Sequence, residues 1–193
     1  MTILSPQPEL TPLLPLVGGW RAEGHTQDSV LGPGVPVTST EEFRWLEGGY
    51  FLVQTYDTVF GDGPAQRGVN YWYHDAGAGR LGITFFSNNG PYTEEGNRYR
   101  GEATDGRLTF QGPARFQYEL DDQGRVKLNP DGTVTVAWWL RGQDGDWRPW
   151  MPGLSMPRCS PCRRTFSPGK KVSMSWLFQE TISSFRRMAS ARR

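Results

Sequence analysis

The sequence predicts an all-β protein: an antiparallel up-and-down barrel of about nine or ten strands, with a short N-terminal helical turn and a basic C-terminal tail. Aromatic residues make up 13% of the 193 residues, and Gly (24) and Pro (15) are frequent, as in chains of short strands joined by turns. Apolar and polar residues also alternate in many short segments. Consecutive strands joined by tight turns form a meander, and closing it into a barrel removes both exposed edges.

The N-terminal apolar segment, residues 8–17, carries three prolines and therefore cannot form a long regular helix. The pattern indicates either one or two helical turns that cap one end of the barrel or a loop that lies over the core. If the segment is helical, its expected buried residues are Leu10, Leu13, Leu14 and Val17.

The first strand is expected to begin at Trp20, where Gly18 and Gly19 allow the entering backbone to turn tightly. An inward Trp20 would plug one end of the barrel. Because strand side chains alternate between two faces, an inward Trp20 places His25 on the outside, which argues against His25 as an interior ligand.

Two later segments, residues 114–120 and 133–141, show the clearest alternation. The positions expected to share one face are Phe116, Tyr118 and Leu120 in the first segment and Val134, Val136, Trp138 and Leu140 in the second. An acid–base pair at His74 and Asp75 is disfavoured, because adjacent strand residues face opposite ways and Asp75 is expected to begin a turn.

Charge divides the chain into an acidic body and a basic tail. Residues 1–153 hold 12 Lys and Arg against 19 Asp and Glu, whereas residues 154–193 hold nine Lys and Arg against one acid. This split predicts a barrel over residues 1–153 and a separate tail over residues 154–193. Apolar residues between 172 and 188 recur near helical spacing, which indicates a basic amphipathic helix. The abrupt change in composition also fits a non-native tail, arising from a frame change or a cloning junction.

Several motifs resemble those of the lipocalin-like (calycin) β-barrels. Gly-Gly-Trp at 18–20 is similar to the Gly-x-Trp of that group. Leu-Glu-Gly-Gly-Tyr at 46–50, Tyr-Trp-Tyr-His-Asp at 71–75 and Asp-Gly-Thr at 131–133 resemble segments of small bacterial lipocalin-like proteins of unknown function. The resemblance covers residues 10–151 and implies a closed barrel that holds a small molecule inside.

The resemblance to the nitrobindins, a related haem-binding group, is more distant. They begin with Gly-x-Trp-x-Gly-x-Gly, and Ala22 replaces the middle glycine here. Their haem-ligating histidine lies near the C-terminus, whereas this chain has no histidine after His74, so haem and other cofactors are not expected. Cys159 and Cys162 have Cys-x-x-Cys spacing without further Cys or His nearby, so we interpret them as incidental thiols and expect no metal site.

The aromatic side chains of the strands could line a ligand cavity or only fill a core. The candidate ligand-binding residues are Trp20, Trp45, Tyr56, Tyr71, Tyr73, Phe85, Phe116 and Trp138. The expected ligand is a small apolar or amphipathic molecule, and no motif identifies catalytic residues.

Three functions fit these observations, and a fold alone does not choose among them. The leading hypothesis is binding of the small molecule inside the barrel. The alternative is an isomerase or cyclase that uses general acid chemistry from an interior Tyr or Glu. The third is a structural or interaction module whose C-terminal helix docks a partner. Whether the protein is an enzyme is therefore left open.

Partners and location follow from composition. No run of 18 apolar residues occurs, so no transmembrane segment is expected, and the first residues lack the pattern of a secretory signal. The sequence therefore predicts a cytoplasmic protein, and the resemblance to small bacterial lipocalin-like proteins implies a bacterial one. The aromatics of the tail are not interleaved with its arginines and the body is acidic, so specific nucleic-acid binding is not expected. A homodimer is compatible with the sequence.

Overall fold

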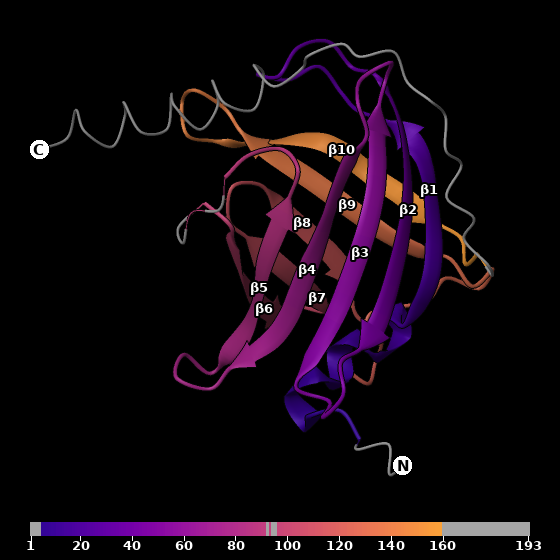
Figure 1. The fold of residues 1–193 in the computed structure, drawn as a ribbon, viewed down its shortest axis with the longest axis vertical. Coiled ribbons are helices and arrows are strands. Elements are labelled where there is room, and N and C mark those ends of the chain that lie inside the picture. Colours follow the sequence, from indigo (N-terminus) through magenta and orange to yellow (C-terminus); the bar gives the residue numbers. More distant parts are fainter. Residues whose placement is uncertain (1–4, 92, 94–95, 160–193) are drawn as a thin grey trace, which may run out of the picture.

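The computed structural model describes residues 5–91, 93 and 96–159. In this part of the chain, one 3-10 helix precedes ten strands that form a single antiparallel sheet in sequence order (Figure 1). The helix η1 spans Pro8–Leu16. The strands are β1 Gly18–His25, β2 Pro36–Trp45, β3 Phe51–Phe60, β4 Gln66–Asp75, β5 Arg80–Ser87, β6 Arg98–Thr104, β7 Arg107–Gln111, β8 Arg115–Glu119, β9 Val134–Arg141 and β10 Trp147–Met156.

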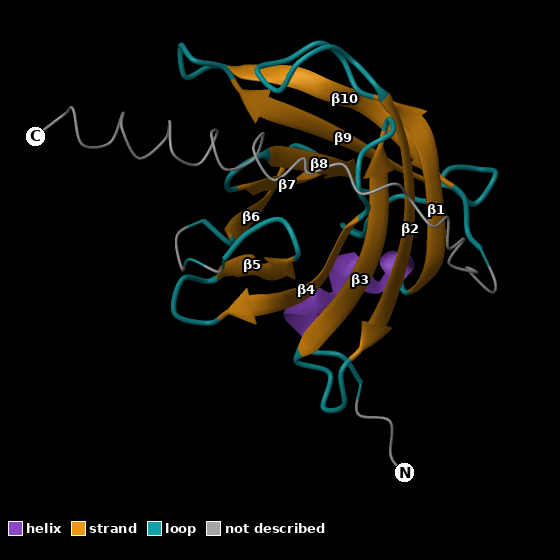
Figure 2. Ribbon diagram, turned by 45° about the horizontal axis from the view of Figure 1, so that its top comes forward, coloured by secondary structure: helices purple, strands orange, loops and turns teal. Residues whose placement is uncertain are grey.

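The sheet curls into a nearly closed barrel because the end of the described chain returns to β1 (Figure 2). The backbone N–H of Arg21 donates to the carbonyl of Pro157 at 3.0 Å, and that of Gln27 donates to the carbonyl of Trp150 at 2.7 Å. The up-and-down barrel predicted from the sequence is therefore confirmed. The described helix is not long and apolar enough to cross a membrane.

The last strand, β10, continues past the expected boundary at residue 153. Register irregularities between Pro149 and Leu154 carry the strand through its proline and glycine positions. Leu154 and Met156 then re-enter the core, where they are 7% and 1% exposed. The barrel therefore extends beyond residue 153, and residues 160–193 of the expected tail lie outside the described residues.

Helix η1 lies across one end of the barrel (Figure 2). Its buried residues are Leu10, Leu13 and Leu16. The prediction that Leu14 and Val17 are buried is wrong: Leu14 is 38% exposed and Val17 is half-buried. A 3-10 helix has three residues per turn, so the residues that share its buried face are spaced by three.

Trp20 lies under this helix, fully buried, at the end that the sequence predicts. Its indole Nε1 donates to the carbonyl of Leu16 at 2.6 Å. The Arg158 guanidinium lies 4.7 Å from the centre of the indole ring and donates to the carbonyls of Pro15 and Val17, each at 3.0 Å. One side chain beyond β10 thus ties the helix, the start of β1 and the end of the barrel together.

Local predictions along the strands are mostly confirmed. Gly18 adopts a positive φ of 126°, a conformation that favours glycine. His25 is exposed, as the alternation from Trp20 requires. Asp75 begins a turn, in which its side chain accepts a hydrogen bond from the N–H of Ala78.

Candidate functional site

Inward-facing side chains differ between the two halves of the barrel. Near η1 they are apolar and fully buried. This closed end contains Trp20, Phe43, Leu52, Trp72, Leu108 and Val134, each no more than 1% exposed. Because nothing polar and accessible faces inward among these residues, the closed end is a packed core.

The other half of the interior has a polar wall on β2, β3 and β4. Strand register and alternation point five polar side chains inward: Ser39, Glu41, Gln54, Thr58 and Asn70. Glu41, Thr58 and Asn70 are only half-buried although they point inward. We call these five residues the polar wall; its accessible surface lies on the inner side of the barrel.

The Trp72 indole sets the direction of the hydrogen bonds along the polar wall. An indole N–H can only donate. Trp72 Nε1 donates to Oε1 of Gln54 at 3.0 Å, so the amide of Gln54 presents Nε2 to Glu41 and donates to its Oε2 at 2.7 Å. Asn70 Nδ2 also donates to Gln54 Oε1, at 2.7 Å, and its own Oδ1 is then buried without a hydrogen-bond partner among the described residues.

Glu41 is held by neutral donors. Besides Gln54, the hydroxyl of Ser39 donates to Oε1 of Glu41 at 3.3 Å, and Ser39 shares a 2.7 Å hydrogen bond with Thr58. Among the described residues, no ion pair to Glu41 is formed. Burial raises the pKa of the Glu41 carboxyl, against the lowering effect of the hydrogen bonds from Gln54 and Ser39. The carboxyl therefore keeps its proton to a higher pH than an exposed glutamate does.

Three tyrosines lie in the interior close to this carboxyl. Burial raises the pKa of Tyr56, Tyr99 and Tyr118, so their hydroxyls stay neutral around neutral pH. The charge of Glu41 contributes to raising the pKa of Tyr56 and Tyr118, and Tyr56 contributes to that of Tyr99. Glu41 of the polar wall is thus coupled electrostatically to Tyr56 and Tyr118, whereas Tyr99 is coupled to Tyr56.

Aromatic rings on β5, β6, β8 and β9 continue the inner surface next to the polar wall and pack against one another. The ring of Phe116 lies 4.5 Å from that of Trp138 and 5.2 Å from that of Tyr99, between centroids. Phe85 lies 5.5 Å from Tyr99. We call Phe85, Tyr99, Phe116 and Trp138 the aromatic wall. All of them except Phe116 are half-buried, so this half of the interior pairs a polar surface with an aromatic one.

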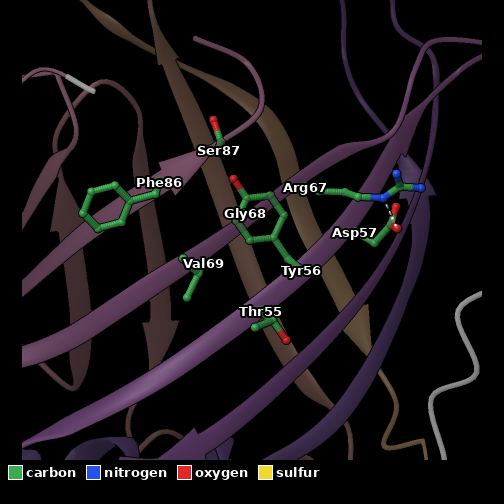
Figure 3. A pocket seen from close by; sticks show the side chains of 8 residues that line it. All are labelled: Thr55, Tyr56, Asp57, Arg67, Gly68, Val69, Phe86 and Ser87. Atoms are coloured by element: carbon green, nitrogen blue, oxygen red, sulfur yellow. Dashed lines mark hydrogen bonds and ion pairs between the residues drawn. The ribbon is translucent and has the colours of Figure 1, made fainter. Parts of the chain in front are cut away.

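A depression of about 350 Å³ lies beside the interior where β3, β4 and the end of β5 meet (Figure 3). Its lining residues are Thr55, Tyr56, Asp57, Arg67, Gly68, Val69, Phe86 and Ser87. A side chain at Gly68 would place Cβ 2.5 Å from the Tyr56 hydroxyl oxygen, so glycine lets Tyr56 lie against β4. Asp57 and Arg67 form a 2.7 Å ion pair beside it. The depression therefore shares Tyr56 with the interior.

Half of the residues predicted to bind a ligand face this part of the interior. Tyr56 lies on the strand that carries Gln54, and Phe85, Phe116 and Trp138 belong to the aromatic wall. All four occupy inward positions of the sheet, and Phe85 on β5 is paired directly with Asn70 of the polar wall.

The other four predicted residues lie elsewhere. Trp20 is in the core of the closed end, and Trp45 packs against that core. Tyr71 and Tyr73 lie on the outer face of β4, where their ring centroids are 6.3 and 6.1 Å from that of Phe51. Alternation explains this, because the residue between the two tyrosines points inward.

Sequence reasoning missed the polar wall and two interior tyrosines. The missed residues are Ser39, Glu41, Gln54, Thr58, Asn70, Tyr99 and Tyr118. A signal was present: Glu41 stands two positions before the buried Phe43, so the two share a face once the strand is recognised.

In the described part of the chain, no three His, Cys, Asp or Glu side chains lie close enough together to hold a metal ion. Cys159 is disulfide-bonded, which differs from the free thiol expected from the sequence. Cys162 lies outside the described residues.

Comparison with known proteins supports the barrel alone. No family model matches this chain, and no curated protein does. The crystal structure of Rv2717c from M. tuberculosis is similar, with a TM-score of 0.53 and 13% sequence identity over 80% of this chain and 99% of that one. At this identity the likeness concerns the fold, and a shared fold does not carry a function with it.

Proposed function

We propose that the protein binds a small amphipathic molecule in the half of the barrel between the polar wall and the aromatic wall. The observation that carries this proposal is the set of inward polar side chains that are only half-buried. Polar groups directed into a barrel are costly unless something hydrogen-bonds to them. A ligand with one polar end and one apolar end complements the two walls.

The contrast with the closed end supports the same proposal. A barrel that needed only stability could fill both halves with apolar side chains, as it does around Trp72. Instead Glu41, Gln54 and Asn70 form a directed chain of hydrogen bonds on one side. Pockets that bind small molecules have this character: mostly apolar and aromatic walls with a few oriented polar groups.

Native mass spectrometry of the gently purified protein, compared with its denatured mass, tests the proposal first. We expect a non-covalent adduct of small mass. A second measurement titrates the neutral fluorophore N-phenyl-1-naphthylamine, whose emission rises in an apolar site. We expect saturable binding to the whole protein.

A matched pair of variants on β3 then locates the bound probe. Thr58 points inward and its neighbour Val59 points outward. Thr58→Trp fills the interior and should weaken probe binding by about tenfold or more, which corresponds to about 1.4 kcal/mol. Val59→Trp should leave the affinity unchanged, and circular dichroism of both variants verifies folding. Equal affinity in the two folded variants would contradict an interior site.

An enzyme on the same barrel is the second candidate, and the raised pKa of Glu41 favours it. A carboxyl that retains its proton can act as a general acid towards a bound substrate, with Tyr56 as a second proton donor. This candidate requires a turnover that Glu41→Gln or Tyr56→Phe abolishes while binding persists. If those variants change affinity only, the protein is a binding protein.

A further inference from the structure

The polar wall leaves one buried acceptor without a hydrogen-bond donor among the described residues. Because the Trp72 indole can only donate, it fixes the amide of Gln54, which in turn fixes the amide of Asn70. The result is a buried Asn70 Oδ1 without a donor among the described residues. Glu41 likewise receives hydrogen bonds from Gln54 and Ser39, and neither carries a positive charge.

Within the described part of the chain, the groups that face Glu41 offer no cation either. From β3 the facing titratable group is Tyr56, and from across the barrel it is Tyr118. From β1 the facing residues are Trp20 and Ala22, neither of which titrates. An acidic group surrounded by phenols and amides stabilises an incoming cation, since a buried carboxylate is favourable only when it is paired.

The aromatic wall is suited to the same kind of ligand. Ring faces attract ammonium and guanidinium groups, and the attraction is stronger where water is excluded. A hydrocarbon body attached to the cation would also lie against Phe85, Phe116 and Trp138. Both walls of the interior therefore complement a positively charged, partly apolar molecule.

We propose that the ligand is a cationic amphiphile, an ammonium group on an aromatic or apolar body, with Glu41 as its counter-ion. This inference rests on the interior site proposed above and names the class of molecule that the site takes. The competing ligand class is a neutral molecule whose carbonyl or ether oxygen accepts a hydrogen bond from a protonated Glu41. The neutral donors around Glu41 favour the cation, because among the described residues nothing positively charged pairs with this carboxyl.

Three probes with one ring system separate these classes: the cation 1-naphthylmethylamine, the neutral alcohol 1-naphthylmethanol and the anion 1-naphthaleneacetate. Their affinities for the whole protein are measured by isothermal titration calorimetry at about pH 5 and about pH 8, because burial moves the change in charge of Glu41 from acid towards higher pH. We expect the amine to bind about tenfold tighter than the alcohol at the higher pH, the acetate to bind weakest, and the preference for the amine to shrink in acid.

A pair of isosteric variants on β2 assigns the effect to one carboxyl. Glu41→Gln removes the inward charge, whereas Glu42→Gln removes the same charge from an exposed position one residue along the strand. We expect Glu41→Gln to abolish the preference for the amine while still binding the alcohol, and Glu42→Gln to behave as the wild type. The retained alcohol binding shows that the barrel remains folded and its interior open.

The possible failures are distinguishable. Equal affinity for amine and alcohol in the wild type, or an amine preference that survives Glu41→Gln, overturns the cation preference and leaves the interior site in place. Tighter binding of the alcohol assigns the site to the neutral class instead. If none of the three probes binds, both the cation preference and the interior site fail.

Discussion

The closed end of this barrel and the half lined by the polar wall and the aromatic wall, which we call the open half, are built by the same strands with the same alternation. Their inward side chains nevertheless differ in polarity. Near η1 the inward side chains, which include those of Trp20, Leu52 and Leu108, are apolar and buried. Towards the other end, β2, β3 and β4 turn Glu41, Gln54 and Asn70 into the same interior. The residue type at each inward position therefore decides whether that part of the interior is a packed core or a polar surface.

The two halves also contribute differently to the stability of the fold. Burying apolar side chains stabilises the fold by roughly 25 cal/mol for each Å² removed from water. Burying a carboxyl without a cation, or an amide oxygen without a donor, costs stability. If the open half is a binding site, substitutions there should change ligand affinity or pH dependence, whereas substitutions at the closed end should mainly change the free energy of unfolding.

The largest expected effect is at the closed end. Trp20→Ala removes a fully buried indole and its hydrogen bond to Leu16, so we expect a loss of about 3–5 kcal/mol in the free energy of unfolding. Urea denaturation followed by far-ultraviolet circular dichroism measures the loss. Trp138→Ala, which removes a half-buried indole from the aromatic wall, should cost clearly less. Equal losses would mean that the open half is as tightly packed as the closed end.

Arg158 gives the next largest effect, because it lies on Trp20 and donates to two carbonyls of the helix segment. We expect Arg158→Ala to lower the free energy of unfolding by about 1–3 kcal/mol, the range for hydrogen bonds from charged groups.

The control for that prediction is a second exposed arginine, one that contacts neither the helix segment nor Trp20. Arg148 forms an exposed ion pair with Asp144, and Arg148→Ala should cost only about 0–1 kcal/mol. A loss at Arg158 no greater than the loss at Arg148 would show that the segment after β10 does not secure the barrel. It would also mean that Arg158, beyond residue 153, adds little to the stability of the barrel.

The sequence predicted the fold more fully than the site, for a physical reason. Turn-forming glycines and two-residue alternation are local, so the strands and the place of Trp20 could be read from short stretches. The site depends on which strand positions meet across the barrel, and that is not local. Tyr71 and Tyr73 were therefore expected to line the cavity although both lie on the outer face of β4.

The end of the barrel was missed for a related reason. Pro152 and Gly153 interrupt the alternation, and that interruption favoured a domain boundary in the sequence. In the structure, irregular pairing of β10 with β9 absorbs the two residues and returns Leu154 to the core. Such irregularities are set by the partner strand, so the sequence of β10 alone could not reveal them.

The smallest expected effect concerns Glu41 in the absence of ligand, and its sign tests the open half directly. Burial raises the pKa of this carboxyl in the folded protein. The proton that it retains stabilises the folded state fully below the unfolded pKa of about 4.3, and that contribution is lost as pH rises through the raised folded value. Glu41→Gln has no carboxyl proton to lose. The difference between its melting temperature and that of the wild type should therefore shift in favour of the variant as pH rises from about 4 towards neutrality.

Scanning calorimetry of the wild type, Glu41→Gln and Glu42→Gln over that range measures the difference. Gln at position 41 can still accept from Gln54 through its amide oxygen, so a gain that grows with pH reports the buried charge rather than lost hydrogen bonding. Glu42 is exposed, and its variant should differ from the wild type by an amount that does not follow this course. If the melting temperatures of Glu41→Gln and the wild type change with pH in the same way, Glu41 is solvated or already paired. The polar wall then has no unpaired acid, and the proposed preference for a cationic ligand fails.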